Sequence, residues 1–256
     1  MSRQTPAAQP PAGKADLHVH TSFSDGMAEA RELLDYVQEQ AQLDVLAVTD
    51  HDDIRGAWLA REAWAKGNYT FDFVLGVEAT AIEGHVLALF IEEPVPTLCP
   101  VAELLESVHR QGGIAVAPHP MNWLTRSLGE AALRRAVAGL HGIETANCSP
   151  GSGVRRRRAL ELNRAELRLA EVGGSDAHFL DFVGGAFTQF PGHTPAELKD
   201  AILGRETVAC NGSVPRWRQI GARRIARQTW RGFMTTPRRM GWRPTAASFV
   251  RRFFRV

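Results

Sequence analysis

The amino-acid sequence predicts an α/β protein, a closed or distorted barrel rather than an open sheet, with a basic segment at the C-terminus. Apolar runs of strand length alternate with segments of helical periodicity over residues 15–212, which indicates a largely parallel sheet. Polar residues follow nearly every predicted strand, as they do at the C-terminal mouth of a barrel. A length of 256 residues is also ordinary for one barrel domain.

Composition limits what surrounds this domain. Residues 1–14 are polar and rich in Pro and Ala, without the apolar core of a signal peptide, so we expect a disordered leader. No apolar run is long enough to span a membrane. Cys99, Cys148 and Cys210 have no CxxC spacing and indicate neither a disulfide framework nor a thiolate zinc site. We therefore expect a cytoplasmic protein, which could be peripheral to a membrane.

The first half of the domain alternates strands and helices. In a strand over residues 16–20, His18 and His20 point to the same face, about 6–7 Å apart. Amphipathic periodicity predicts helices over residues 29–40 and 54–66. Apolar runs predict strands over residues 43–48, 71–77 and 84–91.

The second half continues this alternation. Pro100 opens a helix and Gly112 ends it. Apolar spacing predicts further helices around Leu133 and over residues 155–169 and 195–203. Short apolar segments predict strands over residues 114–117, 142–146, 169–174 and 207–210.

Histidine and acidic residues gather at the predicted strand ends. His18 and His20 are spaced to hold one metal ion, and the turn after Asp25 can return its carboxylate to the same mouth. Taken alone, this motif could also be a buried strand with two satisfied histidines. So many polar groups at one rim would be costly to desolvate unless metal ions compensated them. The candidate metal ligands are His18, His20, Asp25, His51, Glu78, His85, His119, Asp176 and His178.

The motifs DLHVHTSFSDG, TDHDD, GVEAT, EGHVL, APHP and GSDAH resemble, in the same order, those of the polymerase and histidinol phosphatase (PHP) superfamily. The resemblance covers about residues 15–212. It implies a distorted (β/α)7 barrel with a trinuclear metal centre that hydrolyses phosphoesters.

The resemblance also implies a partition of the ligands. His18, His20, Glu78 and Asp176 would hold one metal; Glu78 would bridge to a second, held with His85 and His119; and Asp25, His51 and His178 would hold the third. Imidazole and carboxylate ligands suit two or three divalent Mn, Fe or Zn ions. Such ions would lower the pKa of a bridging water from ~15.7 to about 7 and so supply a hydroxide nucleophile.

Residues around these ligands offer weaker candidates. Asp50 and Asp52 flank His51 and could orient imidazoles, although Asp50 could equally be a turn residue. Arg155 and Asn147 follow a predicted strand and are candidates for binding the substrate. A solvated helix face is the alternative for Arg155.

The C-terminal segment, residues 213–256, contains twelve arginines and no lysine or acidic residue, so it carries +12 and leaves −10 on the remainder. Apolar stripes lie beside arginines over residues 222–233 and 246–255, and Arg223, Arg227 and Arg231 share one helical face. This pattern suits an anionic membrane surface, and slightly less well a nucleic acid. We therefore expect residues 213–256 to form an appendage that docks onto an anionic partner and is dispensable for hydrolysis of a small phosphoester. The alternative is a segment packed on the barrel or on a partner chain.

Three functions are therefore open. The first is a phosphatase or phosphodiesterase acting on a phosphorylated small molecule. The second is a 5′→3′ exonuclease or oligonucleotide phosphoesterase, which the short segment between His85 and His119 disfavours, because PHP nucleases carry a long insertion there. The third is a non-catalytic metal-binding regulatory module, which the complete ligand set disfavours.

Overall fold

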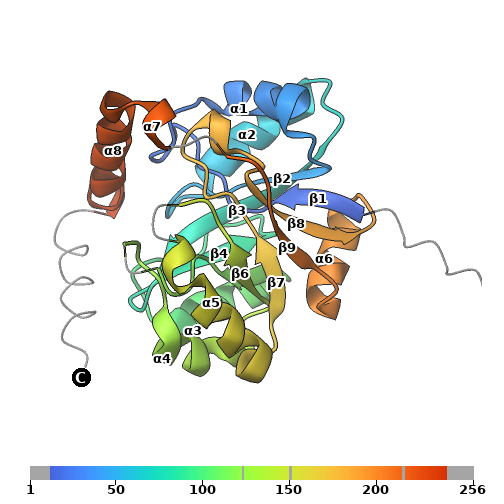
Figure 1. Cartoon of the computed structure of the whole chain (residues 1–256), viewed down its shortest axis with the longest axis vertical. Coiled ribbons are helices and arrows are strands. Elements are labelled where there is room, and N and C mark those ends of the chain that lie inside the picture. The colour runs from blue at the N-terminus through green and yellow to red at the C-terminus, as the bar shows by residue number, and fades with distance from the viewer. Residues whose placement is uncertain (1–11, 123, 150–151, 215–216, 241–256) are drawn as a thin grey trace, which may run out of the picture.

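Nine strands form one sheet in the computed structural model of the chain, which describes residues 12–122, 124–149, 152–214 and 217–240 (Figure 1). The strand order is β7-β6-β5-β4-β3-β2-β1-β8-β9. The strands are β1 (Ala12–Asp16), β2 (Val45–Val48), β3 (Asp72–Thr80), β4 (His85–Leu89), β5 (Ile114–Ala117), β6 (Gly142–Ala146), β7 (Ala170–Gly173), β8 (Ala186–Pro191) and β9 (Val208–Asn211).

The sheet is mixed. β1, β2 and β3 pair in parallel, as do β5, β6 and β7, whereas β4 is antiparallel to both its neighbours. A tight turn, in which the Ala81 amide donates to the Gly84 carbonyl at 2.9 Å, joins β3 to β4. So short a connection permits only antiparallel pairing, since a parallel pair needs a long crossover.

The two ends of the sheet approach each other and almost close the barrel. The Thr188 hydroxyl on β8 donates to the Gly173 carbonyl at 2.8 Å and accepts from the Gly173 amide at 2.9 Å. A Cβ atom at residue 173 would lie 2.3 Å from the Phe187 carbonyl oxygen, so glycine is required for this approach. The predicted distorted α/β barrel is confirmed. β9 corresponds to the strand expected over residues 207–210, and β8 is an addition to the expected strands.

The helices follow the predicted order. They are α1 (Ala30–Tyr36), continued by a π-helical turn (Val37–Ala41), α2 (Arg55–Lys66), α3 (Val101–Arg110), α4 (Gly129–Ala136), α5 (Ser152–Leu162), continued by a second π-helical turn (Asn163–Leu167), α6 (Pro195–Gly204), α7 (Trp217–Ile220) and α8 (Ala222–Met240). No helix of the described residues is both long and apolar enough to cross a membrane.

Alternate residues of the strands belong to two apolar clusters on opposite faces of the sheet. Leu46 and Leu75 pack in the cluster that holds helix residues such as Leu33 of α1 and Leu104 of α3. Val45, Val74 and Leu87 pack in the second cluster with Leu198 and Ile202 of α6. Because side chains alternate along a strand, Glu78 and His85 share the face of this second cluster.

Two expectations about the N-terminal part are wrong. The first strand begins at Ala12, because residues 12–15 pair antiparallel with β8, so residues 12–14 belong to the sheet rather than to a leader. This strand ends at Asp16, so His18 and His20 follow it instead of lying within it. The segment is held instead by an isolated bridge between Val19 and Ala177.

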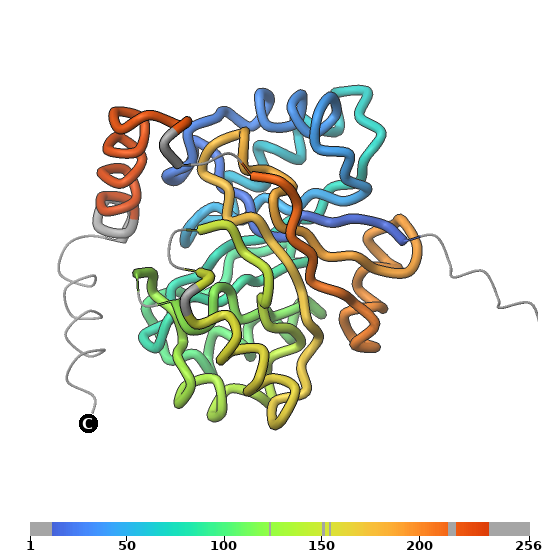
Figure 2. Tube along the Cα trace, viewed as in Figure 1, coloured from blue at the N-terminus to red at the C-terminus, as the bar shows by residue number. Residues whose placement is uncertain are grey.

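The C-terminal segment does not stand apart from the barrel. Ile220 is buried, Ile225 packs against the main core, and the Arg231 guanidinium donates to the carbonyls of Ser22 and Ser24. Figure 2 shows α8, in red, beside the loop that follows β1, in blue. Its described part is therefore packed on the barrel, which was the alternative to an appendage. The second expected stripe, residues 246–255, lies outside the described residues.

Candidate metal centre

The nine predicted ligands lie together at one end of the barrel. Glu78 and His85 are carried by β3 and β4, and the other ligands by the loops that follow β1, β2, β5 and β7. The backbone joins these loops: the Glu78 amide donates to the Thr49 carbonyl, and the Asp52 amide donates to the Glu78 carbonyl. His51 and His178 are partly buried, and the other ligands are buried.

Glu78 is the centre of the cluster. Its Oε1 lies 2.7 Å from His85 Nδ1 and 2.9 Å from His119 Nε2. Its Oε2 lies 3.2 Å from His18 Nε2, 3.3 Å from His20 Nε2 and 3.2 Å from His51 Nδ1. One carboxylate therefore faces five imidazoles, with its two oxygens serving different sets, which is the geometry of a bridging ligand.

Asp176 completes the innermost group. Its Oδ1 lies 3.5 Å from His18 Nε2 and 3.3 Å from His20 Nε2. Donor atoms of His18, His20, Glu78 and Asp176 all lie within 4.8 Å of one another, close enough to share one metal ion.

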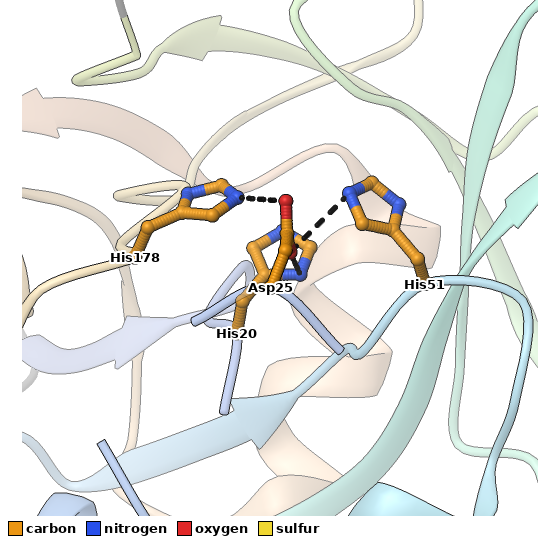
Figure 3. A group of neighbouring side chains, drawn as sticks. All are labelled: His20, Asp25, His51 and His178. Carbon is orange, nitrogen blue, oxygen red and sulfur yellow. Dashed lines mark hydrogen bonds and ion pairs between the residues drawn. The ribbon is translucent and has the colours of Figure 1, made fainter. Parts of the chain in front are cut away.

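Asp25 organises a second group nearer the surface (Figure 3). Its Oδ2 lies 3.1 Å from His178 Nε2, and its Oδ1 lies 3.7 Å from His51 Nε2 and 3.8 Å from His20 Nδ1. These residues also have donor atoms within 4.8 Å of one another, as do His51, Glu78 and His85 in a third group. This third group contains His51, whereas the family resemblance implied that His119 shares a metal with Glu78 and His85.

Buried ring nitrogens point into the cluster without hydrogen bonds. His18 Nε2 and both nitrogens of His20 make none with the described part of the chain. Leaving buried polar atoms unpaired is costly, so a further group that accepts these lone pairs is expected. The donor set is imidazole and carboxylate, which suits a divalent transition metal.

Opposite charges dominate the electrostatics. Burial lowers the pKa of His18, but the charges of Asp176 and Glu144 outweigh it and raise that pKa well above its ordinary value. Burial likewise opposes charge on His20, yet the carboxylates of Asp176 and Glu78, each 3.3 Å from its Nε2, raise its pKa to about 10. Burial raises the pKa of Glu78, but the imidazoles outweigh it and lower that pKa well below its usual range. Metal binding must therefore displace protons from some imidazoles.

Glu144, at an inward position of β6, supports the cluster and escaped the sequence argument. Its Oε1 accepts from His18 Nδ1 at 3.0 Å, and its Oε2 accepts from the His119 amide and from the Asn147 side chain, both at 2.7 Å. A proton held on His18 Nδ1 leaves Nε2 to face the cluster, so Glu144 fixes the tautomer that a ligand needs. A charged residue inside the strand predicted over residues 142–146 was the signal that could have identified it.

Asp16 is a second buried carboxylate of this kind. It accepts from the backbone amides of Ser175 at 2.9 Å and Gly184 at 2.8 Å, which ties the end of β1 to the loop that carries Asp176. Burial raises the pKa of Asp16 to about 6.

The flanking aspartates accept hydrogen bonds from amide and hydroxyl groups of neighbouring loops and of β3. Asp50 accepts from the backbone and hydroxyl groups of Thr21 and Ser24, so it braces the turn before Asp25. Asp52 accepts from the Thr80 amide at 2.6 Å and the Thr80 hydroxyl at 2.9 Å. These contacts are those of a turn residue, which was the alternative to a role for Asp50 in orienting imidazoles.

Two ligand candidates have unusual backbone conformations. His119 has φ +29° and Asp176 has φ +54°, a region that residues other than glycine seldom adopt. Surrounding contacts must hold such conformations, and they concentrate at functional sites. For His119, two contacts supply this support. Its backbone amide donates a hydrogen bond to Glu144, and its Nδ1 lies 3.1 Å from the Thr125 hydroxyl.

A pocket adjoins the cluster on the side of His119. Asn147, Ser152, Arg155 and Arg156 line it, together with Glu144. Its walls thus run from a candidate metal ligand to two guanidinium groups at the start of α5.

Comparisons with known proteins bear on the family of the chain. Residues 155–207 match a family described as PHP-associated. An uncharacterized protein of Methanocaldococcus jannaschii is 31% identical over 158 residues, 57% of this chain and 89% of that protein. The 5′-3′ exoribonuclease Rnm of Escherichia coli is 32% identical over 88 residues, 33% of this chain and 30% of that enzyme.

A solved structure shows the same fold. A two-domain protein of Bacteroides vulgatus, described as containing a predicted PHP-like metal-dependent phosphoesterase, matches with a TM-score of 0.63 at 20% identity, over 90% of this chain and 74% of that one. The barrel, the clustered motifs and these matches lead to one conclusion. The chain belongs to the polymerase and histidinol phosphatase (PHP) superfamily.

Proposed function

We propose that this chain hydrolyses a phosphoester with two or three divalent transition-metal ions held by the nine clustered residues. The observation that carries the proposal is Glu78, whose two oxygens face separate sets of imidazoles. A buried carboxylate so placed suits a bridge between two cations.

The chemistry of imidazole supports one partition of the ligands. A neutral imidazole has a single lone pair, so each histidine can serve one metal only. We assign His18 and His20 with Glu78 and Asp176 to the first site, His85 and His119 with Glu78 to the second, and Asp25, His51 and His178 to the third. This partition uses every imidazole once.

When bound, the metal ions would supply a hydroxide nucleophile at neutral pH and stabilise charge on the phosphoryl oxygens. The chain's own part is to orient the ligands. Glu144 keeps the His18 ring in place, and the Asp176 carbonyl, 2.9 Å from His178 Nδ1, does the same for His178. The buried surroundings keep bulk water away from the ligands.

The pocket beside His119 is the proposed place of the substrate. Arg155 would bind an anionic or phosphoryl oxygen there, since guanidinium suits bidentate contacts with phosphate. The Asn147 amide donates to Glu144 and its carbonyl oxygen accepts from Ser149, so Asn147 shapes the wall that the substrate meets. Arg155→Ala should raise KM more than it lowers kcat. Arg157→Ala is the matched control, because Arg157 pairs with Glu161 on the outside of the same helix.

Hydrolysis at the end of an oligonucleotide is the second candidate. Similarity to the exoribonuclease Rnm favours it, although that similarity covers only 33% of this chain. The short segment between His85 and His119 still favours a small phosphorylated substrate.

Purified protein loaded with Mn²⁺ can decide between these activities on a panel of phosphomonoesters, phosphodiesters and short oligonucleotides. We expect metal-dependent turnover, with a small-molecule phosphoester as the best substrate. Glu78→Gln should abolish it, and Glu62→Gln on the surface of α2 should not. A folded, metal-loaded protein without turnover of any member of the panel would contradict the proposal.

We further propose that the outer face of α8 binds an anionic membrane surface. Trp230 and Phe233 are 59% and 64% exposed, and their rings lie 6.2 Å apart. Exposed Arg223 and Arg227 on the same helix supply positive charge. Exposed aromatic side chains beside arginines are typical of helices that lie on anionic lipid.

Sedimentation with phosphatidylglycerol vesicles tests this contact. The wild type should bind at low salt, and a Trp230→Ser, Phe233→Ser double variant should not, whereas Leu203→Ser, at another exposed apolar site, should bind normally. Binding to single-stranded DNA but not to vesicles would assign the face to nucleic acid instead.

A further inference from the structure

The inner face of α8 contacts the loop that carries Asp25. The Arg231 Nη2 atom donates to the Ser22 carbonyl oxygen at 2.5 Å and to the Ser24 carbonyl oxygen at 3.3 Å. A charged donor strengthens such bonds compared with neutral ones. On the far side of the same turn, Asp50 accepts from Thr21 and Ser24. The turn before Asp25 is therefore held from two directions, one of which is the C-terminal helix.

The next residue of the helix lies against the Asp25 carboxylate itself. A Cβ atom at Gly232 would be 2.8 Å from Asp25 Oδ2, nearer than real Cβ contacts come. This is the oxygen that lies 3.1 Å from His178 Nε2. Glycine thus lets the helix backbone approach a carboxylate at the candidate third metal site, and a side chain would displace that carboxylate.

The other arginines in the described part of α8 do not contact the loop that carries Asp25 in the contacts that the structure gives them. Arg223 and Arg227 are exposed, and Arg224 lies 3.8 Å from Asp181 and over the ring of Phe179. Thr235, one turn after Arg231, is buried and donates to the Arg231 carbonyl at 2.8 Å. The face formed by Arg231, Gly232 and Thr235 is therefore the one turned towards the site.

We propose that α8 is a wall of the metal centre, in which Arg231 is a positioning residue for Asp25 and Gly232 provides the space for its carboxylate. The inference rests on the proposed metal-dependent function and extends it to the C-terminal segment. It predicts that the segment is needed for occupancy of the outer site, made by Asp25, His51 and His178, while the inner sites around Glu78 remain occupied. The sequence-based expectation of an appendage dispensable for hydrolysis would then not hold.

Full-length variants test this wall through metal binding without substrate. Gly232→Val should abolish binding at one Mn²⁺ site or weaken it at least about tenfold, which is the usual range for a disturbed ligand environment. Arg231→Ala should weaken the same site, and Arg231→Lys should restore part of the loss, because a lysine keeps the charge but offers a different donor geometry. Ala226→Val and Arg227→Ala, on the exposed side of the helix, are the matched controls.

Calorimetric Mn²⁺ titration of each metal-free variant gives the readout, with the thermal midpoint of the metal-free protein recorded beside it. Selective loss of one site at an unchanged midpoint supports the wall. Wild-type binding isotherms for both Gly232→Val and Arg231→Ala would overturn it and leave the proposed function intact. A wild type that takes up no Mn²⁺, Fe²⁺ or Zn²⁺ would overturn the proposed function, and this inference with it.

Discussion

Replacing Glu144 by glutamine tests how the protein prepares its ligands before a metal arrives. The carboxylate accepts from three donors: His18 Nδ1, the His119 amide and the Asn147 side chain. Glutamine keeps the shape but turns one of the two oxygens into an NH₂ donor, so at least one of these donors loses its acceptor. Leaving a buried donor unsatisfied costs about 1–3 kcal/mol.

The same change should weaken metal binding. Losing the group that orients a metal-binding imidazole typically lowers affinity about 10–100-fold. That range corresponds to about 1.4–2.8 kcal/mol of binding free energy. Because Glu144 contacts one ligand of each proposed inner site, His18 and His119, we expect a loss of Mn²⁺ affinity in the upper part of this range.

Mn²⁺ titration by calorimetry and urea denaturation of the metal-free protein measure the two effects separately. Glu166→Gln is the control, since Glu166 makes an exposed ion pair with Arg134 and should leave both measurements close to wild type. Wild-type Mn²⁺ affinity in Glu144→Gln would refute the claim that this carboxylate prepares the site.

Three further predictions follow from named residues. The pKa of His20, raised from 6.5 to about 10 in the metal-free protein, means that the folded state holds this proton more tightly than the unfolded one. The stabilisation, up to about 5 kcal/mol from this group, is complete below pH 6.5 and lost towards pH 10. Urea midpoints should fall over that range while Mn²⁺ affinity rises, and flat midpoints would contradict this. Burial beside Asp16 and Asp176 raises the pKa of Cys148 to about 12, so iodoacetamide at mildly alkaline pH should label this thiol slowly in the folded protein and quickly in urea; equal rates would be evidence against its burial. Gly173→Ala should lower the free energy of unfolding in urea by about 2–3 kcal/mol, because its Cβ would meet the Phe187 carbonyl. The control Gly153→Ala should leave that free energy close to wild type, since its Cβ would meet no neighbour within 4 Å.

Periodicity and strand-end chemistry account for much of what was predictable. The strand predicted over residues 142–146 coincides with β6, and β5 coincides with residues 114–117. Placing polar residues at the ends of strands was enough to bring Glu78 and His119 to the same rim, because neighbouring strands of one sheet present their ends together.

The missing parts depend on contacts distant in sequence. β8 alternates buried and half-buried residues over a short stretch, and its pairing with β1 joins segments about 170 residues apart. The periodicity of α8 grouped Arg231 with Arg223 and Arg227 on a basic face. Only the carbonyls of Ser22 and Ser24, far away in the chain, turn Arg231 towards the barrel.

The central claim is that Glu78 joins two metal sites within a multinuclear centre. Anomalous diffraction at the manganese edge, from crystals of the wild-type protein grown with Mn²⁺, tests it most directly. We expect two or three peaks in the cluster, with one on each side of Glu78 and each within about 2.0–2.3 Å of its ligand atoms. A single peak that Glu78 does not contact, or no peak in the cluster, would contradict the account.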